Sequence, residues 1–425
     1  MKIVIIGYGP GGAAAAVTAR TFNPESEIEL ITEETIESHK KPGASMALEF
    51  PDTPDLKIKD WSFDSLSKKR VKLVTGTQVI GGDSKSKEIY IKGPKGEKTL
   101  KYDQLILATG GIPSVPDIPG IDLQGVYTIQ TMADTSKIGN QLSGMNSIVV
   151  VGAGFSGLET AERILALGKE VHLVIRSRLM RRQLEEPMSK ELQSRLSKKL
   201  HIHVGKSPSS VVGTKKVEGI LLGDEIIPAD AVLFMTGVHP NTIIAEKLGV
   251  KIGSLGGIVV DETMKTSVND IFAVGDCVEM KDPLTGKPLL LPIGSIAARA
   301  GRQAGVIAAG STKIYDDTLR RLQYDRIFGT DIVVIGHSTT TATQMGLKTD
   351  VQYIEDSTEF AKMALITSEG RLIGGQVISS RMGARFAYEI LERVESGATL
   401  KDKPLLKPRH ERLREYLEST FGPIR

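Results

Sequence analysis

The chain contains two glycine-rich loops of one kind, and each comes directly after a run of apolar residues. Gly7-Tyr8-Gly9-Pro10-Gly11-Gly12 follows residues 2–6, and Gly152-Ala153-Gly154-Phe155-Ser156-Gly157 follows residues 147–151. A nearly continuous apolar run is typical of a strand that is buried on both faces of a parallel sheet. After each loop the sequence predicts a helix and then a second strand. The chain is therefore expected to contain two strand–helix–strand units, which indicate an α/β fold.

The first loop has the G-x-G-x-x-G spacing of a dinucleotide-binding loop in a Rossmann-like domain. Gly7 permits a tight turn, Gly9 lets the backbone approach a pyrophosphate, and Gly12 allows close packing of helix on strand. The amides that begin the helix expected at 13–21 would face the phosphates. The predicted binding residues of the loop are Gly7, Gly9, Gly11 and Gly12.

Two acidic residues, Glu33 and Glu34, follow the strand expected at 27–31. A carboxylate at this place accepts hydrogen bonds from ribose hydroxyls. The alternative is a glycine turn that binds no ligand, but it does not explain why two acidic residues follow the second strand. We therefore predict that the first unit binds a dinucleotide.

The second loop ends differently, because arginines stand where an acid is expected. After the strand at 171–175 the chain reads Arg176-Ser177-Arg178, and Arg182 follows. A carboxylate there would repel a 2′-phosphate, whereas a guanidinium can bind it bidentately. We predict NADPH over NADH, with a solvated basic turn as the alternative. The predicted binding residues of this unit are Gly152, Gly154, Phe155, Ser156, Gly157, Arg176 and Arg182.

The length of 425 residues exceeds one ordinary core and indicates two or three domains. We predict a first dinucleotide-binding domain of residues 1–116 and 247–322, and a second of 117–246. Antiparallel-looking strands and a helix near 383–396 indicate a third, α+β domain at 323–425. Two dinucleotide sites in one chain are explained most simply by electron transfer from a reduced nicotinamide to a flavin.

Charge and hydropathy exclude several classes of protein. The net charge is +3, from 54 basic and 51 acidic residues, which favours neither nucleic acid nor an anionic membrane as partner. The basic stretch 401–414 is interpreted as a solvated helix. No apolar stretch is long enough to span a bilayer, and no signal-peptide pattern precedes the first strand. We expect a cytoplasmic protein, and no cluster of metal ligands stands out.

Four further motifs resemble, in the right order, those of the FAD- and NAD(P)-dependent pyridine nucleotide-disulfide oxidoreductases. They are residues 102–111, 236–241, 271–276 and 292–305. The likeness covers nearly the whole chain and implies a glutathione-reductase-type fold with bound FAD. In the family, the aspartate of the third motif bonds the ribityl chain of the flavin, and the helix of the fourth faces the pyrimidine ring. The site residues that the resemblance adds are Ala108, Thr109, Gly110, Gly237, Gly275, Asp276, Pro292 and Ile293.

The region from Gln323 resembles the dimerisation domain of the branch that contains NADH oxidases and coenzyme A-disulfide reductases. Residues 336–346 and 371–376 carry this likeness, which implies a homodimer. Glu159 matches a family glutamate that lies near the nicotinamide, and we predict a catalytic role for it. An ordinary glutamate on a helix surface is the alternative.

Cysteine content decides which chemistry of the family is open to this chain. Disulfide-reducing members use a thiolate beside the flavin, expected here within residues 37–45, where no cysteine occurs. The sole cysteine, Cys277, is interpreted as a small buried residue. Residues 39–45 partly resemble the flavin-pocket segment of rubredoxin and ferredoxin reductases, which implies that Lys41 and Pro42 line the pocket. Lys41 could stabilise negative charge on reduced flavin, or it could face solvent.

The sequence thus predicts an enzyme in which NAD(P)H reduces FAD and the flavin passes electrons onward without a redox thiol. The candidate acceptors are rubredoxin or ferredoxin, a quinone, oxygen or an artificial dye. One alternative is a coenzyme A-disulfide or polysulfide reductase whose cysteine has been lost or replaced. Another is a flavin-bound redox sensor with little turnover.

Overall fold

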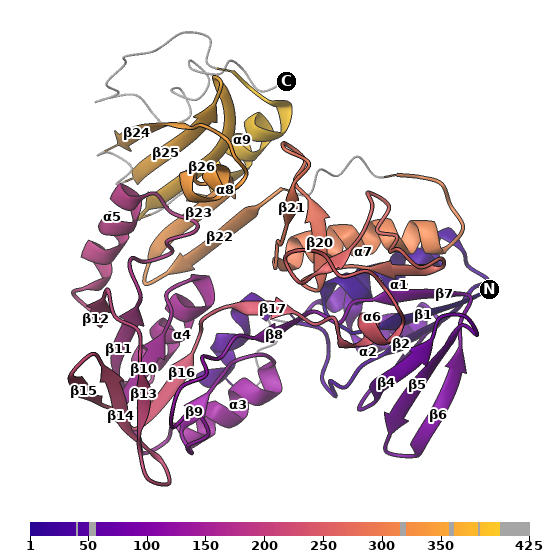
Figure 1. Ribbon diagram of the computed structural model, residues 1–425, viewed down its shortest axis with the longest axis horizontal. Helices are drawn as coiled ribbons and strands as arrows, with labels where there is room; N and C mark the ends of the chain where they lie inside the picture. The colour runs from indigo at the N-terminus through magenta and orange to yellow at the C-terminus, as the bar shows by residue number, and fades with distance from the viewer. Residues whose placement is uncertain (40, 51–56, 315–319, 357–360, 381–382, 400–425) are drawn as a thin grey trace. The chain divides into compact units, whose positions relative to one another are not determined.

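The structure is a computed structural model that describes residues 1–39, 41–50, 57–314, 320–356, 361–380 and 383–399 (Figure 1). The chain forms two compact units. The first contains residues 1–114, 130–137 and 237–319, and the second contains residues 115–129, 138–236 and the chain from Arg320 onward. The predicted division into three domains stays a prediction.

A five-stranded parallel sheet organises the first unit, in the order β19-β7-β1-β2-β3. Its strands are Lys2–Ile6 (β1), Glu27–Ile31 (β2), Val71–Val74 (β3), Gln104–Leu107 (β7) and Ile271–Ala273 (β19). The side chains of Ile3, Ile5 and Leu105 are fully buried. The run of apolar residues at 2–6 therefore forms a strand covered on both faces, as predicted.

Two helices of the first unit pack against each other through small residues. They are α1 (Pro10–Phe22) and α7 (Gly294–Ala308). A Cβ on Gly301 would lie 2.1 Å from the carbonyl oxygen of Gly11, and a Cβ on Gly305 would lie 2.5 Å from that of Ala15. Only glycine allows this approach, which brings the start of α7 to the first glycine loop.

Smaller elements complete the first unit. Three antiparallel strands form a separate sheet, Gln78–Asp83 (β4), Glu88–Gly93 (β5) and Gly96–Lys101 (β6). Short strands pair as Gly111–Pro113 (β8) with Val238–Pro240 (β17), and as Ile258–Val259 (β18), Val278–Lys281 (β20) and Pro288–Leu289 (β21). The short helices are Lys41–Leu48 (η1), Lys59–Trp61 (η3), Phe63–Lys68 (α2) and Ile243–Lys247 (α6). A further helix, Met132–Gln141 (α3), belongs to the first unit up to Lys137 and to the second unit from Ile138.

The second unit contains a parallel sheet in the order β12-β11-β10-β16-β9. Its strands are Val126–Tyr127 (β9), Ser147–Val151 (β10), Glu170–Ile175 (β11), His201–Val204 (β12) and Ala231–Phe234 (β16). The helices Phe155–Ala166 (α4) and Glu186–Leu196 (α5) follow β10 and β11. An antiparallel sheet of Ser210–Gly213 (β13), Val217–Leu222 (β14) and Glu225–Pro228 (β15) packs its apolar side chains into the same core.

An antiparallel sheet of five strands forms the rest of the second unit, in the order β22-β23-β26-β25-β24. Its strands are Leu322–Ile327 (β22), Thr330–Gly336 (β23), Asp350–Asp356 (β24), Ala361–Ser368 (β25) and Arg371–Ser379 (β26). Helix α9 (Gly383–Ser396) covers one face, and the short helix α8 (Thr339–Gln344) follows β23 (Figure 1). The predicted α+β character of this region is confirmed.

Most predicted elements are confirmed, and the start of one helix needs correction. The helix expected at 13–21 begins earlier, at Pro10, because proline is tolerated in the first turn of a helix. The basic stretch 401–414 lies outside the described residues. Among the described residues, none of the helices is both long and apolar enough to cross a membrane.

Candidate functional site

In the first glycine loop, backbone atoms leave no room for a Cβ atom at two of the glycines, whereas a third glycine has free space around it. Gly7 has a φ of +106°, and a Cβ there would lie 2.1 Å from the carbonyl oxygen of Ala108. A Cβ on Gly12 would lie 1.9 Å from the carbonyl oxygen of Gly7, whereas a Cβ on Gly9 would meet nothing within 4 Å. The free space at Gly9 is what a phosphate needs in order to approach the backbone. The loop therefore fits the pyrophosphate of FAD.

Helix α1 begins at this loop, and no side chain at its N-cap bonds the amides of the first turn. The N-cap residue is Gly9. The first amides of a helix have no partner within the helix and carry partial positive charge. A phosphate at Gly9 would satisfy the amides of the first turn.

Other predicted flavin residues gather at the same edge of the sheet. β1, β7 and β19 are parallel, so the segments that follow them, including Thr109 and Asp276, leave the sheet at one edge. Ala108 donates its backbone hydrogen bond to Ile6 at 2.8 Å. The predicted positions that follow these strands or begin α7 are Ala108, Thr109, Gly110, Gly275, Asp276, Pro292 and Ile293.

The acidic pair and the start of η1 complete the predicted flavin residues. Glu33 and Glu34 follow β2, which pairs with β1 up to Ile31, so they lie at the edge where the glycine loop begins. The side chain of Glu33 is exposed, and the amide of Glu34 bonds the hydroxyl of Thr32 at 3.1 Å. Lys41 and Pro42 begin η1, and their side chains lie outside what the structure describes.

The single cysteine is not exposed to substrate. Cys277 has no accessible surface, and its thiol donates a hydrogen bond to the carbonyl oxygen of Val274 at 3.3 Å. Burial raises the pKa of this thiol. A thiol that is both buried and protonated is a poor nucleophile, so the interpretation of Cys277 as a small buried residue is confirmed.

The second glycine loop has the same contact pattern as the first. Gly152 has a φ of +108°, and a Cβ there would lie 2.4 Å from the carbonyl oxygen of Met235. A Cβ on Gly157 would lie 2.1 Å from the carbonyl oxygen of Gly152, and one on Gly154 would meet nothing within 4 Å. Phe155 and Ser156 open α4 behind the N-cap Gly154. A dinucleotide pyrophosphate therefore fits here for the same physical reason.

Gly237, which the resemblance adds to the predicted cofactor-binding residues, belongs to the first unit. It adopts a φ of +105° and has open space where a Cβ would be. This backbone conformation strongly favours glycine.

A cluster of arginines follows β11 in the second unit. The side chains of Arg176 and Arg182 are exposed, whereas Arg178 and Arg181 are half-buried. Burial, and then the charges of Arg176, Arg182 and Arg178, lower the pKa of Arg181. Like charges that act on one another in this way make the site attractive to an anion.

The segment that carries these arginines is held by residues far away in the sequence. Ser338 donates a hydrogen bond to the carbonyl oxygen of Arg182 at 2.7 Å. The carboxylate of Glu185 accepts hydrogen bonds from the hydroxyl of Thr339 at 2.6 Å and from its amide at 2.8 Å. Gln376 in β26 also bonds both the backbone and the side chain of Glu185. These partners were not predicted from the sequence, because no local pattern connects residues 154 or more positions apart.

Glu159 is buried within the second unit, which excludes the alternative of an ordinary glutamate on a helix surface. Its side chain is only 7% exposed. Burial, followed by a hydrogen bond with Asp325 of β22, raises the pKa of Glu159 to about 10. At neutral pH the group is therefore a neutral carboxylic acid that can donate a hydrogen bond. Asp325 was not predicted, and its place beside Glu159 arises only from packing.

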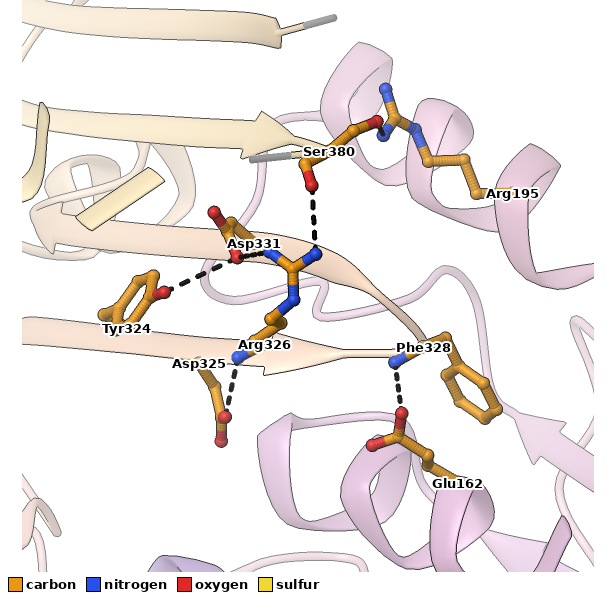
Figure 2. A network of polar contacts seen from close by, with 8 residues as sticks. All are labelled: Glu162, Arg195, Tyr324, Asp325, Arg326, Phe328, Asp331 and Ser380. Carbon is orange, nitrogen blue, oxygen red and sulfur yellow. Dashed lines mark hydrogen bonds and ion pairs between the residues drawn. The ribbon is translucent and has the colours of Figure 1, made fainter. Parts of the chain in front are cut away.

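A network of polar contacts joins α4 to the hairpin that carries Asp325. Glu162 accepts a hydrogen bond from the amide of Phe328 at 2.7 Å, and Arg326 pairs with Asp331 at 2.7 Å (Figure 2). Arg326 also bonds the carbonyl oxygen of Ser380 at 3.1 Å. The bond from Phe328 to Glu162 joins the β22–β23 hairpin to the helix that bears Glu159, and the contacts of Arg326 hold the hairpin together and join it to the residue after β26.

The described residues contain no group of three or more histidine, cysteine, aspartate or glutamate side chains placed to hold a metal ion. The two glycine loops support the binding of two dinucleotides, and the second unit also contains a buried carboxylic acid and an arginine cluster.

Comparison with known proteins gives a consistent result. The profile of the pyridine nucleotide-disulphide oxidoreductase family matches residues 1–304. An NADH oxidase from Methanocaldococcus jannaschii is 32% identical over 419 residues, which cover 92% of this chain and 89% of the relative.

Two solved structures share the fold. A NAD-dependent persulfide reductase from A. fulgidus has a TM-score of 0.87 at 28% identity, covering 96% of this chain and 80% of its own. An engineered water-forming NADPH oxidase bound to NADPH, derived from an NADH oxidase of Lactobacillus brevis, also has a TM-score of 0.87. Its identity is 23%, and the likeness covers 98% of this chain and 96% of that chain.

Proposed function

The chain belongs to the pyridine nucleotide-disulphide oxidoreductase family and is an FAD-dependent NAD(P)H oxidoreductase, and we propose that it passes electrons from FAD to an acceptor without a redox thiol. The observation that carries this proposal is the pair of glycine loops with one contact pattern, open at Gly9 and at Gly154. In each loop the free space lies at the middle glycine, which is where a phosphate has to approach the backbone.

FAD, when bound, supplies a ring system that accepts a hydride from a nicotinamide and releases electrons to an acceptor. In the proposed site, the first glycine loop and the start of α1 bind the FAD pyrophosphate, and Glu33 or Glu34 binds the ribose. Asp276 orients the ribityl chain, and Lys41 stabilises negative charge on the reduced flavin. Gly152, Gly154 and Gly157 form the loop for the nicotinamide dinucleotide, and Glu159 positions the nicotinamide as a hydrogen-bond donor.

We propose that the nicotinamide cofactor is NADPH, bound at its 2′-phosphate by Arg176 and Arg182. The engineered NADPH oxidase supports this proposal through three of its five substitutions. They introduce adjacent arginine and serine residues and a second arginine five positions after the serine. Arg176, Ser177 and Arg182 have the same identities and the same spacing in this chain.

Of the other two substitutions, one agrees with the sequence of this chain and the other does not. One removes an aspartate directly before the first arginine, where this chain has Ile175. The fifth replaces a glycine, eighteen positions before that aspartate, by alanine, whereas this chain keeps Gly157 at the same spacing. Four of the five positions thus agree with a site that accepts a 2′-phosphate.

The proposed acceptor is oxygen, a quinone or a redox protein such as rubredoxin or ferredoxin. The NADH oxidase relative favours oxygen among these. The persulfide reductase with a similar fold favours a second candidate, a sulfur-reducing enzyme, but reduction through a protein thiol would need a reactive cysteine. Cys277, the sole cysteine, is buried. We therefore favour an oxidoreductase whose acceptor is reduced without a protein thiol. A sulfur-reducing enzyme is the second candidate, and a flavin-bound redox sensor with slow turnover is the third.

The resemblance of the region from Gln323 to a dimerisation domain leads us to propose a homodimer in solution. Light scattering coupled to size-exclusion chromatography measures the mass directly. A particle of twice the chain mass of 45.9 kDa is expected, and a monomer at micromolar concentration would contradict the proposal.

Anaerobic titration of the purified yellow protein with NADPH and, separately, with NADH tests the proposed function. We expect stoichiometric bleaching of the flavin, faster with NADPH than with NADH. Addition of oxygen, a quinone or a reducible redox protein should then restore the colour and support many turnovers. A protein that does not bind FAD on reconstitution, or that is bleached without turnover by any acceptor, would contradict the enzymatic proposal.

A further inference from the structure

Three of the seven histidines of the chain gather on one face of the parallel sheet in the second unit. His172 lies in β11, and His201 and His203 lie two positions apart in β12. His172 is paired with His201 in the register of the two strands, and residues two apart on a strand point to the same face, so all three imidazoles share one face. The rings stack, with the centroid of His172 5.0 Å from that of His201 and 5.3 Å from that of His203.

The strand that carries two of these histidines is the edge strand of the sheet, and it is weakly buried. Among the described strands, β12 pairs with β11 alone. Its residues His201 and Val204 are exposed, and Ile202 and His203 are half-buried. Segments with few buried apolar contacts open at a low cost in free energy. The polar contacts between β11 and β12 therefore contribute a large share of what holds β12 in place.

Polar contacts of the ring nitrogens join the two strands. Nδ1 of His172 lies 3.1 Å from Nε2 of His203. Oε1 of Glu170, which also belongs to β11, lies 3.4 Å from Nε2 of His172 and 3.2 Å from Nε2 of His201. The contact between the two ring nitrogens is a hydrogen bond only when one of them carries a proton and the other does not. If both were protonated, two N–H groups would point at each other.

The arrangement tolerates one added proton but not two. Both contacts of His172 are satisfied when His203 donates from Nε2 to Nδ1 of His172, and His172 donates from Nε2 to Glu170. A proton added at Nδ1 of His203 leaves both contacts intact. A further proton at Nδ1 of His172 removes the acceptor and places two cationic rings side by side. Protonated His201 adds a third positive charge, and Glu170 is the one carboxylate in contact with the cluster.

The surroundings of the cluster favour neutral rings. The charged groups that face it, among the described residues, are Glu170, Glu225 of β15 and Lys206 just past β12. Lys206 pairs with Glu225 at 3.2 Å, which weakens the attraction of that carboxylate for an imidazolium. Burial, followed by the charges of the other histidines, lowers the pKa of His172. Burial, His201 and Lys206 lower the pKa of His203.

From this geometry we propose that His172, His201 and His203 form a proton-operated latch, which holds β12 against β11 at neutral pH and releases it on acidification. In an unfolded chain the imidazoles titrate at about pH 6.5. His172 and His203 titrate at lower pH in the folded protein, so the unfolded state binds more protons as the pH falls. The contribution of the latch is therefore complete above about pH 6.5 and is lost progressively below it.

Release of β12 would also act on the end of β11. The amide of Gly205, directly after β12, bonds the carbonyl oxygen of Ile175 at 2.9 Å, and Arg176 follows Ile175 in the chain. Opening of β12 breaks this bond and loosens the point from which Arg176 extends. Acidification should therefore weaken NADPH binding, a consequence that rests on the proposed function, whereas the latch itself does not.

Hydrogen exchange measured by mass spectrometry on the full-length FAD-loaded protein tests the latch. Between about pH 7.5 and about pH 5.5, after correction for the intrinsic exchange rate, exchange in β12 should rise about tenfold relative to β16, an interior strand of the same sheet. His203→Gln keeps a side-chain amide that can bond His172 but does not titrate, so it should remove most of this rise. The matched control is His239→Gln, an exposed histidine of the first unit, which should leave the rise unchanged.

A second variant keeps the test independent of the first. His203→Lys places a permanent positive charge at the same position, so β12 should exchange at about pH 7.5 as fast as wild-type β12 does at about pH 5.5. The thermal transition of each variant shows whether it is folded. Exchange in β12 that follows β16 at every pH would overturn the proposal, and so would an equal rise in wild type and His203→Gln.

The Kd of NADPH at the two pH values tests the consequence for the cofactor. A 2′-phosphate itself loses charge at roughly pH 6, so wild type is compared with His203→Gln rather than with itself. A larger rise in Kd for wild type supports the link through Gly205 and Ile175, and an equal rise contradicts it. If the protein bound no nicotinamide cofactor, the proposed function would fail, while the exchange of β12 would still decide whether the latch exists.

Discussion

The hydroxyl of Ser338 donates a hydrogen bond to the carbonyl oxygen of Arg182 at 2.7 Å, across 156 residues of sequence. Ser338 is 2% exposed and also caps α8, where its Oγ accepts a bond from the amide of Thr341 at 3.2 Å. One side chain thus fixes the arginine segment after β11 and the start of α8 together. The geometry of the proposed 2′-phosphate site therefore depends on the position of the start of α8.

Ser338→Ala should loosen this arrangement. The change removes a helix cap and leaves the carbonyl of Arg182 without its donor, each at a cost of about 1 kcal/mol or more. We expect a fall of a few degrees in Tm, measured by differential scanning calorimetry, and a higher Kd for NADPH. Ser338→Thr keeps the hydroxyl and should restore most of both. A Tm of Ser338→Ala equal to that of wild type would show that the contact is not stabilising.

Arg176→Ala should separate the two nicotinamide cofactors. Loss of one charge-assisted bond to the 2′-phosphate raises the KM for NADPH roughly tenfold, while the KM for NADH stays nearly unchanged. Steady-state kinetics with both cofactors measures the two values. Arg195→Ala is a suitable control, because Arg195 pairs with Glu191 at 2.8 Å and lies outside the arginine segment. Parallel changes for NADPH and NADH would remove the role of Arg176 in discrimination.

Gly9→Ala should abolish flavin binding while the apoprotein still folds. Gly9 has an ordinary φ of −70°, and a new Cβ would meet no protein atom within 4 Å. The methyl group would instead occupy the space proposed for the pyrophosphate. We expect far-UV circular dichroism close to that of wild-type apoprotein and an absorbance at 450 nm reduced by about tenfold.

Gly12→Ala is the matched variant, because its Cβ would lie 1.9 Å from the carbonyl oxygen of Gly7. This clash is with the backbone, so Gly12→Ala should lower the stability of the apoprotein itself. If Gly9→Ala retained FAD with wild-type affinity, the pyrophosphate would have to lie elsewhere.

Glu159 should make stability fall as the pH rises. Its pKa is about 10 in the folded protein and about 4.3 in an unfolded chain. The stabilising contribution of the neutral acid is therefore complete below about pH 4 and is lost progressively as the pH rises toward 10. Glu159→Gln removes this dependence, so its Tm relative to wild type should increase between about pH 5 and pH 9. A difference in Tm that stays constant over this range would mean that Glu159 is ionised in the folded protein.

Cys277 should take no part in turnover. Its thiol is fully buried and its pKa is raised, so native protein should resist iodoacetamide and react only after unfolding. Cys277→Ala should retain kcat within about twofold and lose about 1 kcal/mol of stability from the small cavity. Mass spectrometry of the labelled protein measures the modification. Rapid labelling of native enzyme with loss of activity would restore a thiol mechanism.

The two glycine loops could be predicted from sequence because their function depends on local geometry. Strand, glycine turn and helix are consecutive in the chain, so the spacing of Gly7, Gly9 and Gly12 is visible in the sequence. The clash of a Cβ on Gly12 with the carbonyl of Gly7 is likewise local. The same holds for Gly152, Gly154 and Gly157. The absence of a cysteine from residues 37–45 is likewise a property of the sequence.

Tertiary structure decided the features that depend on residues far apart in the chain. The sequence left Glu159 open between a helix surface and a functional place, and burial against β22 with Asp325 settles that it is interior. The arginines after β11 line a cavity only because α5 and α8 pack around them, held by Ser338 and Glu185. Charge, burial and pKa depend on neighbours in space, and those neighbours are brought together by folding rather than by the order of the residues.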